Sequence, residues 1–161
     1  MLSEKSIEMV GELGIICMPG CEAFAKKVEA YLKDWRDQQD NGFIVQTSVP
    51  RFANGEGKGL IRESVRGRDI HIITDIFNYN VTYKMYGREN AMSPDDHFQD
   101  LKRIISAIAG KAKRLTVFMP MLYEGRQHKR SARESLDCAL ALQELVNLGV
   151  SNIITFDAHD A

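Results

Sequence analysis

The sequence has few of the residues that mark unusual protein classes. Its 161 residues include 3 cysteines, 4 prolines and 12 glycines, which excludes a disulfide scaffold, a collagen-like repeat and a proline-rich disordered chain. The cysteines (Cys17, Cys21 and Cys138) form no CxxC pair and leave one over, so we expect reduced thiols and a cytoplasmic location. No apolar run approaches the roughly 20 residues of a membrane span, and the N-terminal residues Met1–Lys5 do not resemble a signal peptide.

A strong excess of charge of one sign is also missing. Lys and Arg number 21 and Asp and Glu 22, which gives a formal net charge of -1. This balance argues against the broad basic surface that duplex nucleic acids require, so we expect neither nucleic acid nor membrane as a partner. The composition is 44% hydrophobic, and a chain of this length can bury a core without a metal or disulfide. We expect a single domain over residues 1–161.

Short apolar runs alternate with amphipathic stretches along the whole chain. The runs are too short for helices, are rich in β-branched residues and carry almost no charge; they are Leu13–Met18, Phe43–Val45, Ile70–Ile73, Leu115–Met119 and Ile153–Phe156. Between them, apolar residues recur at helical spacing over Phe24–Trp35, Phe98–Ala109 and Cys138–Val146. This alternation predicts an α/β fold with a mainly parallel sheet of about five strands and flanking helices.

The second helical pattern has clear start signals. Ser93 can cap the helix, Pro94 suits its first position, and Asp95 and Asp96 favour the positive end of its dipole. His97 falls in the first turn, where we expect it to be solvated.

The segment Arg51–Gly59 has two interpretations. Phe52, Asn54 and Glu56 offer an aromatic ring, an amide and a carboxylate, which can stack on a base and contact its edge. Alternatively, Asn54-Gly55 marks the turn of a solvated hairpin, which composition alone favours. The glycine spacing fits neither the Walker loop nor the dinucleotide fingerprint.

Two further segments follow predicted strands, where open α/β sheets bind ligands. Arg126 begins a run of cations that reaches Arg133 and is either a polyanion site or a solvated basic turn. Asp157 and His159 follow the last apolar run, and they either hold a divalent metal or serve as a helix cap and a structural histidine.

Four segments together resemble the ribose-phosphate pyrophosphokinases (PRPP synthetases). Phe52–Glu56 resembles the family's Phe-Ser-Asp-Gly-Glu, and Glu63–Asp69 its Glu-Ser-Val-Arg-Gly-x-Asp. Gly125–Gln127 is similar to part of Ala-Arg-Gln-Asp, and Ile153–His159 to Val-Ile-Thr-Met-Asp-Leu-His. The resemblance implies an N-terminal domain of type I phosphoribosyltransferase fold. It also implies transfer of the β,γ-diphosphoryl group of ATP to ribose 5-phosphate, with Mg²⁺ as the cofactor.

The resemblance assigns a role to each candidate residue. Phe52 would stack on adenine while Asn54 and Glu56 contact its edge, and this segment usually serves a neighbouring subunit's site, which implies a homo-oligomer. Arg126 and Gln127 would hold the nucleotide. His159 would act at the magnesium–triphosphate end as catalytic residue and metal ligand, and Asp157 would be a supporting ligand there.

The sequence also departs from the family pattern. Asn54 and His128 stand where the family has aspartates, and a longer stretch over Asp75–Ser93 is an interface, a lid or an insertion packed on its own aromatics. The family's cationic loop and ribose-phosphate loop lie in a C-terminal half that nothing here matches. We therefore expect an ATP-side domain that is inactive alone, or alternatively a non-catalytic nucleotide-binding, regulatory or assembly module. A flavodoxin-like domain is disfavoured because no anion loop follows the first strand beyond Pro19-Gly20.

Overall fold

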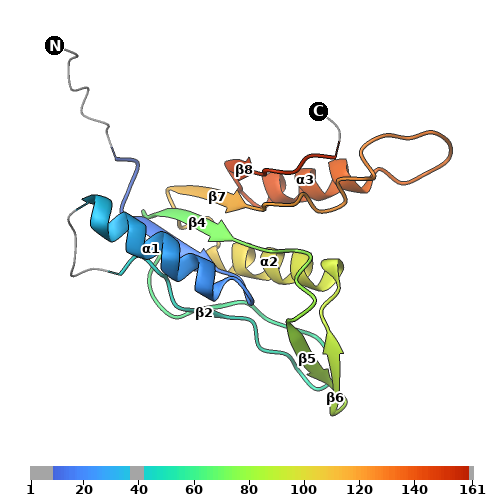
Figure 1. Ribbon diagram of the computed structural model, residues 1–161, viewed down its shortest axis with the longest axis horizontal. Helices are drawn as coiled ribbons and strands as arrows, with labels where there is room; N and C mark the ends of the chain where they lie inside the picture. The colour runs from blue at the N-terminus through green and yellow to red at the C-terminus, as the bar shows by residue number, and fades with distance from the viewer. Residues whose placement is uncertain (1–8, 37–41, 160–161) are drawn as a thin grey trace.

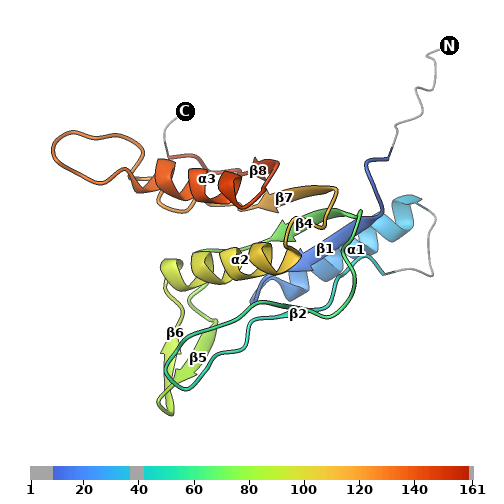
Figure 2. The same ribbon diagram turned by 180° about the vertical axis from the view of Figure 1, so that it is seen from behind.

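The computed structural model describes residues 9–36 and 42–159, in which a parallel sheet carries helices on both faces (Figures 1 and 2). The N-terminal residues Met1–Lys5 lie outside this part of the chain. The strand order is β1-β4-β7-β8, with bounds β1 (Leu13–Cys17), β4 (Asp69–Ile73), β7 (Arg114–Phe118) and β8 (Asn152–Ile154). The helices are α1 (Glu22–Arg36), α2 (Pro94–Ile108) and α3 (Asp137–Asn147). The α/β fold and the three helices match the predictions from the sequence.

The sheet has four strands where the sequence predicted about five. Phe43–Val45 adds only an isolated bridge, in which Ile44 lies parallel to Ile15. A carboxylate oxygen of Glu29 on α1 accepts the backbone N–H groups of the first two residues of this segment, at 2.6 and 3.1 Å. The chain then turns away at Gln46, whose carbonyl accepts an N–H from the hairpin described below. The predicted fifth strand is therefore reduced to a one-residue bridge, in which the Ile15 N–H donates to the Phe43 carbonyl and the Val45 N–H donates to the Ile15 carbonyl before the chain leaves the sheet edge.

Alternating strand residues divide the core between the two faces. The larger cluster packs α2 and α3 against one face, with Ile72 and Val117 fully buried beneath Leu101 and Leu145. The smaller cluster packs α1 against the other face, around Ile15 and Ile73. Figures 1 and 2 show this arrangement, with α1 on one side of the sheet and α2 and α3 on the other. Burial on both faces explains why these strands are continuous apolar runs.

The start of α2 confirms the predicted cap but corrects one residue. The Ser93 hydroxyl accepts the Asp96 N–H at 3.1 Å, and the Asp96 carboxylate accepts the Ser93 N–H at 2.9 Å. His97, which we expected to be solvated, is only 2% exposed, and its Nε2 lies 2.8 Å from the carbonyl oxygen of Asn78. The stretch after β4 covers this turn of the helix, and local sequence carries no sign of that contact.

Two antiparallel hairpins lie outside the main sheet. The first pairs β2 (Thr47–Ser48) with β3 (Leu60–Ile61), which confirms the hairpin interpretation of the segment between them. The second pairs β5 (Thr82–Met85) with β6 (Arg88–Ala91) inside the long stretch after β4. In Figures 1 and 2 this second hairpin projects away from the sheet.

Two further sequence expectations concern thiols and membranes. Cys17, Cys21 and Cys138 are all free, as predicted, and burial raises the pKa of the Cys21 thiol to about 12. In the described part of the chain, no helix is both long enough and apolar enough to span a bilayer.

Candidate functional site

A pocket of about 480 Å³ lies beyond the carboxyl ends of β7 and β8. One wall is the segment Met121–Arg126, which follows β7, and another contains Asp157 and His159, which follow β8. Phe77, Tyr79 and Pro94 close the remaining side. Neighbouring parallel strands deliver their following loops to one edge of the sheet, so the pocket lies where such folds bind ligands.

Backbone pairing continues past the ends of β7 and β8 and positions the wall of the pocket that contains Asp157. Met121 and Asp157 form a parallel bridge, and the Pro120 carbonyl accepts the N–H groups of Phe156 and Asp157, both at 3.0 Å. These bonds keep the two segments side by side after β8 has ended. Asp157 is exposed at the pocket, where its carboxylate is open to a ligand.

Tyr123 fixes the opposite wall to α2. Its ring stacks on Phe98, with centroids 4.2 Å apart and planes 8° from parallel, and its hydroxyl donates to Asp95 at 2.6 Å. Burial, followed by the hydrogen bond to Asp95, raises the pKa of the Tyr123 hydroxyl, which therefore remains a protonated donor. Sequence reasoning missed this residue, because its partners on α2 are distant along the chain.

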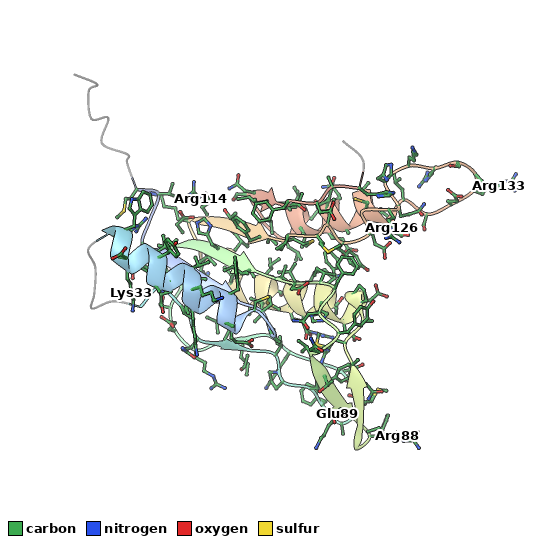
Figure 3. The ribbon with its side chains drawn as sticks, in the orientation of Figure 1. Lys33, Arg88, Glu89, Arg114, Arg126 and Arg133 are labelled. Carbon is green, nitrogen blue, oxygen red and sulfur yellow. The ribbon has the colours of Figure 1, made fainter. Side chains whose placement is uncertain are left out.

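The structure brings together three of the predicted site residues. Arg126, Asp157 and His159 all line the pocket, and Figure 3 shows Arg126 at the base of the loop whose far end carries Arg133. The His159 ring lies 5.6 Å from the His128 ring, edge to face. A cation, a carboxylate and an imidazole thus meet at one sheet edge.

Gln127 lies beside this group and has a different contact. Its side-chain amide donates to the Ser135 carbonyl at 2.8 Å, and its backbone carbonyl accepts the Cys138 N–H at 3.3 Å. Gln127 thereby links the two ends of the basic loop. It is not among the described residues that line the pocket.

The other predicted residues lie elsewhere, in the turn formed by residues 51–57, which we call the Phe52 turn. Phe52 is 53% exposed, and Lys58 Nζ lies 5.9 Å from its ring centroid. Asn54 donates to the Glu56 carboxylate at 2.8 Å and accepts the Glu56 N–H at 3.1 Å. The pocket lining described above takes no residue from this turn, which lies beside β5 and β6 instead. The turn belongs to a hairpin, as one of the two interpretations of the sequence predicted, and its exposed ring leaves base stacking by Phe52 as a prediction.

The turn after β1 is another strand end where an anion could bind. There the Gly20 N–H donates to the carboxylate of Glu22 at 3.0 Å. The start of α1 is thus capped by a negative charge of the chain itself, which disfavours a phosphate at this position.

The donor set of the pocket fits magnesium only in part. Over residues 9–36 and 42–159, no three His, Cys, Asp or Glu side chains gather into a group able to hold a metal. Mg²⁺ bound together with phosphates needs only one or two protein carboxylates, since phosphate oxygens and waters complete its shell. Asp157 meets that need, whereas the imidazole of His159 is a poorer match for a hard cation.

Comparisons with known proteins agree on one family. Residues 13–149 match the model of the N-terminal domain of ribose phosphate pyrophosphokinase. The chain is 35% identical over 114 residues to Ribose-phosphate pyrophosphokinase 1 of Schizosaccharomyces pombe, and 30% identical over 115 residues to Ribose-phosphate pyrophosphokinase of Vibrio parahaemolyticus. Each alignment covers 70% of this chain but only 24% and 32% of the respective relative, so the chain spans about a quarter to a third of their length.

A solved structure supports the fold. The phosphoribosylpyrophosphate synthetase from Mycobacterium smegmatis superposes with a TM-score of 0.70 at 23% identity, covering 92% of this chain and 43% of that chain. Asp157 and His159 lie beyond the residues that match the family model. With a match over most of its length, the chain belongs to the family of ribose phosphate pyrophosphokinase N-terminal domains.

Proposed function

We propose that this chain is the ATP-side domain of a ribose-phosphate diphosphokinase, which converts ATP and ribose 5-phosphate into PRPP and AMP. The observation that carries the proposal is the meeting of Arg126, Asp157 and His159 in one pocket at the ends of β7 and β8. Diphosphoryl transfer depends mostly on positioning and on neutralising phosphate charge, and these groups are suited to both.

Each residue has a role that follows from its chemistry. The planar guanidinium of Arg126 can bind two phosphate oxygens at once. Asp157 would hold Mg²⁺, which when bound neutralises phosphate charge. His159 is exposed at the same pocket and would donate a hydrogen bond to a phosphate oxygen. Gln127 would act indirectly, by holding the loop in shape, because its side-chain amide donates a hydrogen bond to the Ser135 carbonyl.

In this proposal, the Phe52 turn acts at the pocket of a second copy of the chain. Phe52, Asn54 and Glu56 lie apart from the pocket of their own chain, so we propose that they complete the pocket of a neighbour in a homo-oligomer. The hydrogen bonds between Asn54 and Glu56 hold the amide and the carboxylate in a fixed relation. Ribose 5-phosphate would bind mainly to a part of the longer relatives that this chain does not match.

The alternative is a nucleotide-binding or assembly module without turnover. It would use the same pocket, because Arg126, Asp157 and His159 could bind a nucleotide without an acceptor sugar. An enzyme that contained this domain and a second half would form PRPP, whereas a module would not do so in any context.

The first prediction tests whether this domain suffices alone. Purified chain supplied with ATP, Mg²⁺ and ribose 5-phosphate is expected to form no PRPP, because the acceptor-sugar loop is not among its matched segments. Chromatographic detection of AMP and PRPP measures the outcome. PRPP formation that disappears in a His159→Ala preparation would show that the chain is a complete catalyst and contradict the domain assignment.

The second prediction tests the phosphate site. Arg126→Ala is expected to weaken MgATP binding by about 1.5 to 3 kcal/mol, through loss of a charge-assisted contact. Arg133→Ala is the matched control, because this exposed arginine occupies the far end of the same loop (Figure 3) and should cost less than about 1 kcal/mol. Calorimetric titration at fixed salt compares the two. Equal losses would mean that the loop acts only through its summed charge.

A further inference from the structure

The turn of the β5–β6 hairpin contacts the Phe52 turn directly. The Tyr86 N–H donates to the Ala53 carbonyl at 2.7 Å. Gly55 has a φ of 92°, and a Cβ atom added to it would lie 2.9 Å from Met85 Sδ, so the two turns are in close contact at this position. Figures 1 and 2 show both turns together at the lower end of the molecule, away from the sheet. The two turns therefore form one structural unit.

The base of this unit is anchored to α2. The Arg51 guanidinium lies 4.6 Å from the centroid of the Tyr83 ring and donates to Asp100 at 2.9 Å. Arg103 donates to the other oxygen of the same carboxylate at 2.6 Å. Asp100 is 2% exposed, so the contact is shielded from water. These bonds fix both hairpins to the same helix and preorganise the Phe52 turn.

Tyr86 has an unusual conformation for its residue type. Its φ is 49° and that of Gly87 is 77°, so the two-residue turn has positive φ at both positions. Such turns favour Asn, Asp or Gly, and a bulky residue in the left-handed region is strained. Packing does not compensate this strain, because Tyr86 is 75% exposed. Strain retained at an exposed aromatic residue is typical of a functional position.

We propose that Tyr86 provides a second aromatic surface for the nucleobase, next to that of Phe52. This inference rests on the proposed function, and it extends the base-binding unit to both turns. Phe52 directly precedes Ala53, to which Tyr86 is bound, and the two exposed rings are carried by this one rigid unit. Bases stack on aromatic rings irrespective of their hydrogen-bonding edges, so the ligand class is a purine nucleotide held by its base.

The test separates base binding from phosphate binding. Tyr86→Asn is expected to weaken MgATP binding about 10-fold, in line with loss of one base–aromatic contact. Binding of magnesium tripolyphosphate, which has no base, should remain unchanged. Tyr86→Phe keeps the ring and should bind MgATP within about twofold of the wild type. Tyr31→Ala is the control, since Tyr31 is 81% exposed on α1.

The same asparagine variant provides a readout that a purely structural role would not give. Asparagine suits the positive φ of this turn, so Tyr86→Asn should raise the thermal unfolding midpoint while it weakens MgATP binding. Phe52→Ala is measured beside it as the reference for base stacking. Calorimetry gives the affinities, and light scattering gives the mass of each variant.

The outcomes distinguish the inference from the proposed function. Wild-type chain that fails to bind MgATP would overturn both. If Phe52→Ala weakens MgATP binding and Tyr86→Asn does not, the role of Tyr86 is wrong and the proposed function stands. If Tyr86→Asn weakens MgATP and tripolyphosphate equally and also lowers the mass, the ring serves contact between copies, and the inference is overturned.

Discussion

Asp100→Ala is expected to lower the free energy of unfolding by about 3 to 5 kcal/mol. Asp100 binds Arg51 and Arg103 through its two oxygens, and the Arg51 side chain is only 9% exposed. Burial raises the pKa of Asp100 in spite of both cations, so desolvation outweighs the attraction between the charges. Removal of the carboxylate leaves the guanidinium of Arg51 buried without its counter-charge, which is the source of the loss.

Denaturant unfolding with two companion variants tests this explanation. Glu144→Ala removes an exposed ion pair, in which Lys102 Nζ lies 2.7 Å from the carboxylate, and should cost less than about 1 kcal/mol. The double variant Arg51→Met/Asp100→Leu replaces the buried charges by apolar groups and should recover most of the stability. A loss for Asp100→Ala no larger than that for Glu144→Ala would refute the assignment.

Leu145→Ala should destabilise the protein by about 2 to 5 kcal/mol, through lost burial and the cavity left behind. Leu145 is fully buried, and α3 buries few other residues, chiefly Cys138 and Ala141. Leu140→Ala on the same helix is the matched control, because Leu140 is 58% exposed and its truncation should change stability by about 0.5 kcal/mol or less. Thermal and denaturant unfolding of both variants measure the difference, and similar losses would show that α3 contributes little to the core.

The strands of the main sheet could be predicted because burial on both faces leaves a continuous apolar run. Phe43–Val45 has the same composition and yet forms only a one-residue bridge with β1, since the chain then leaves the sheet edge and the Gln46 carbonyl bonds to Arg62, 16 residues away. His97 was misplaced for a similar reason, as its partner is a carbonyl at Asn78, 19 residues away. Local patterns report which residues are apolar, whereas contacts between distant side chains and backbone depend on the assembled fold.

The candidate site could also be predicted only in part. Arg126, Asp157 and His159 could be placed together because parallel strands end at one edge of the sheet. The separation of the Phe52 turn from that pocket could not be predicted, because it depends on contacts such as Arg51–Asp100, which spans 49 residues. No local periodicity encodes such a pair.

The turn at Tyr86 and Gly87 also bears on the order in which the chain folds. A two-residue turn lets β5 and β6 meet within about 1 to 10 μs, whereas each parallel pair of the main sheet must wait for a long crossover to close. The positive φ of Tyr86 offsets this kinetic advantage, since a tyrosine in the left-handed region weakens the isolated hairpin. The hydrogen bond from the Tyr86 N–H to the Ala53 carbonyl stabilises the hairpin against this strain, which couples its formation to that of the Phe52 turn.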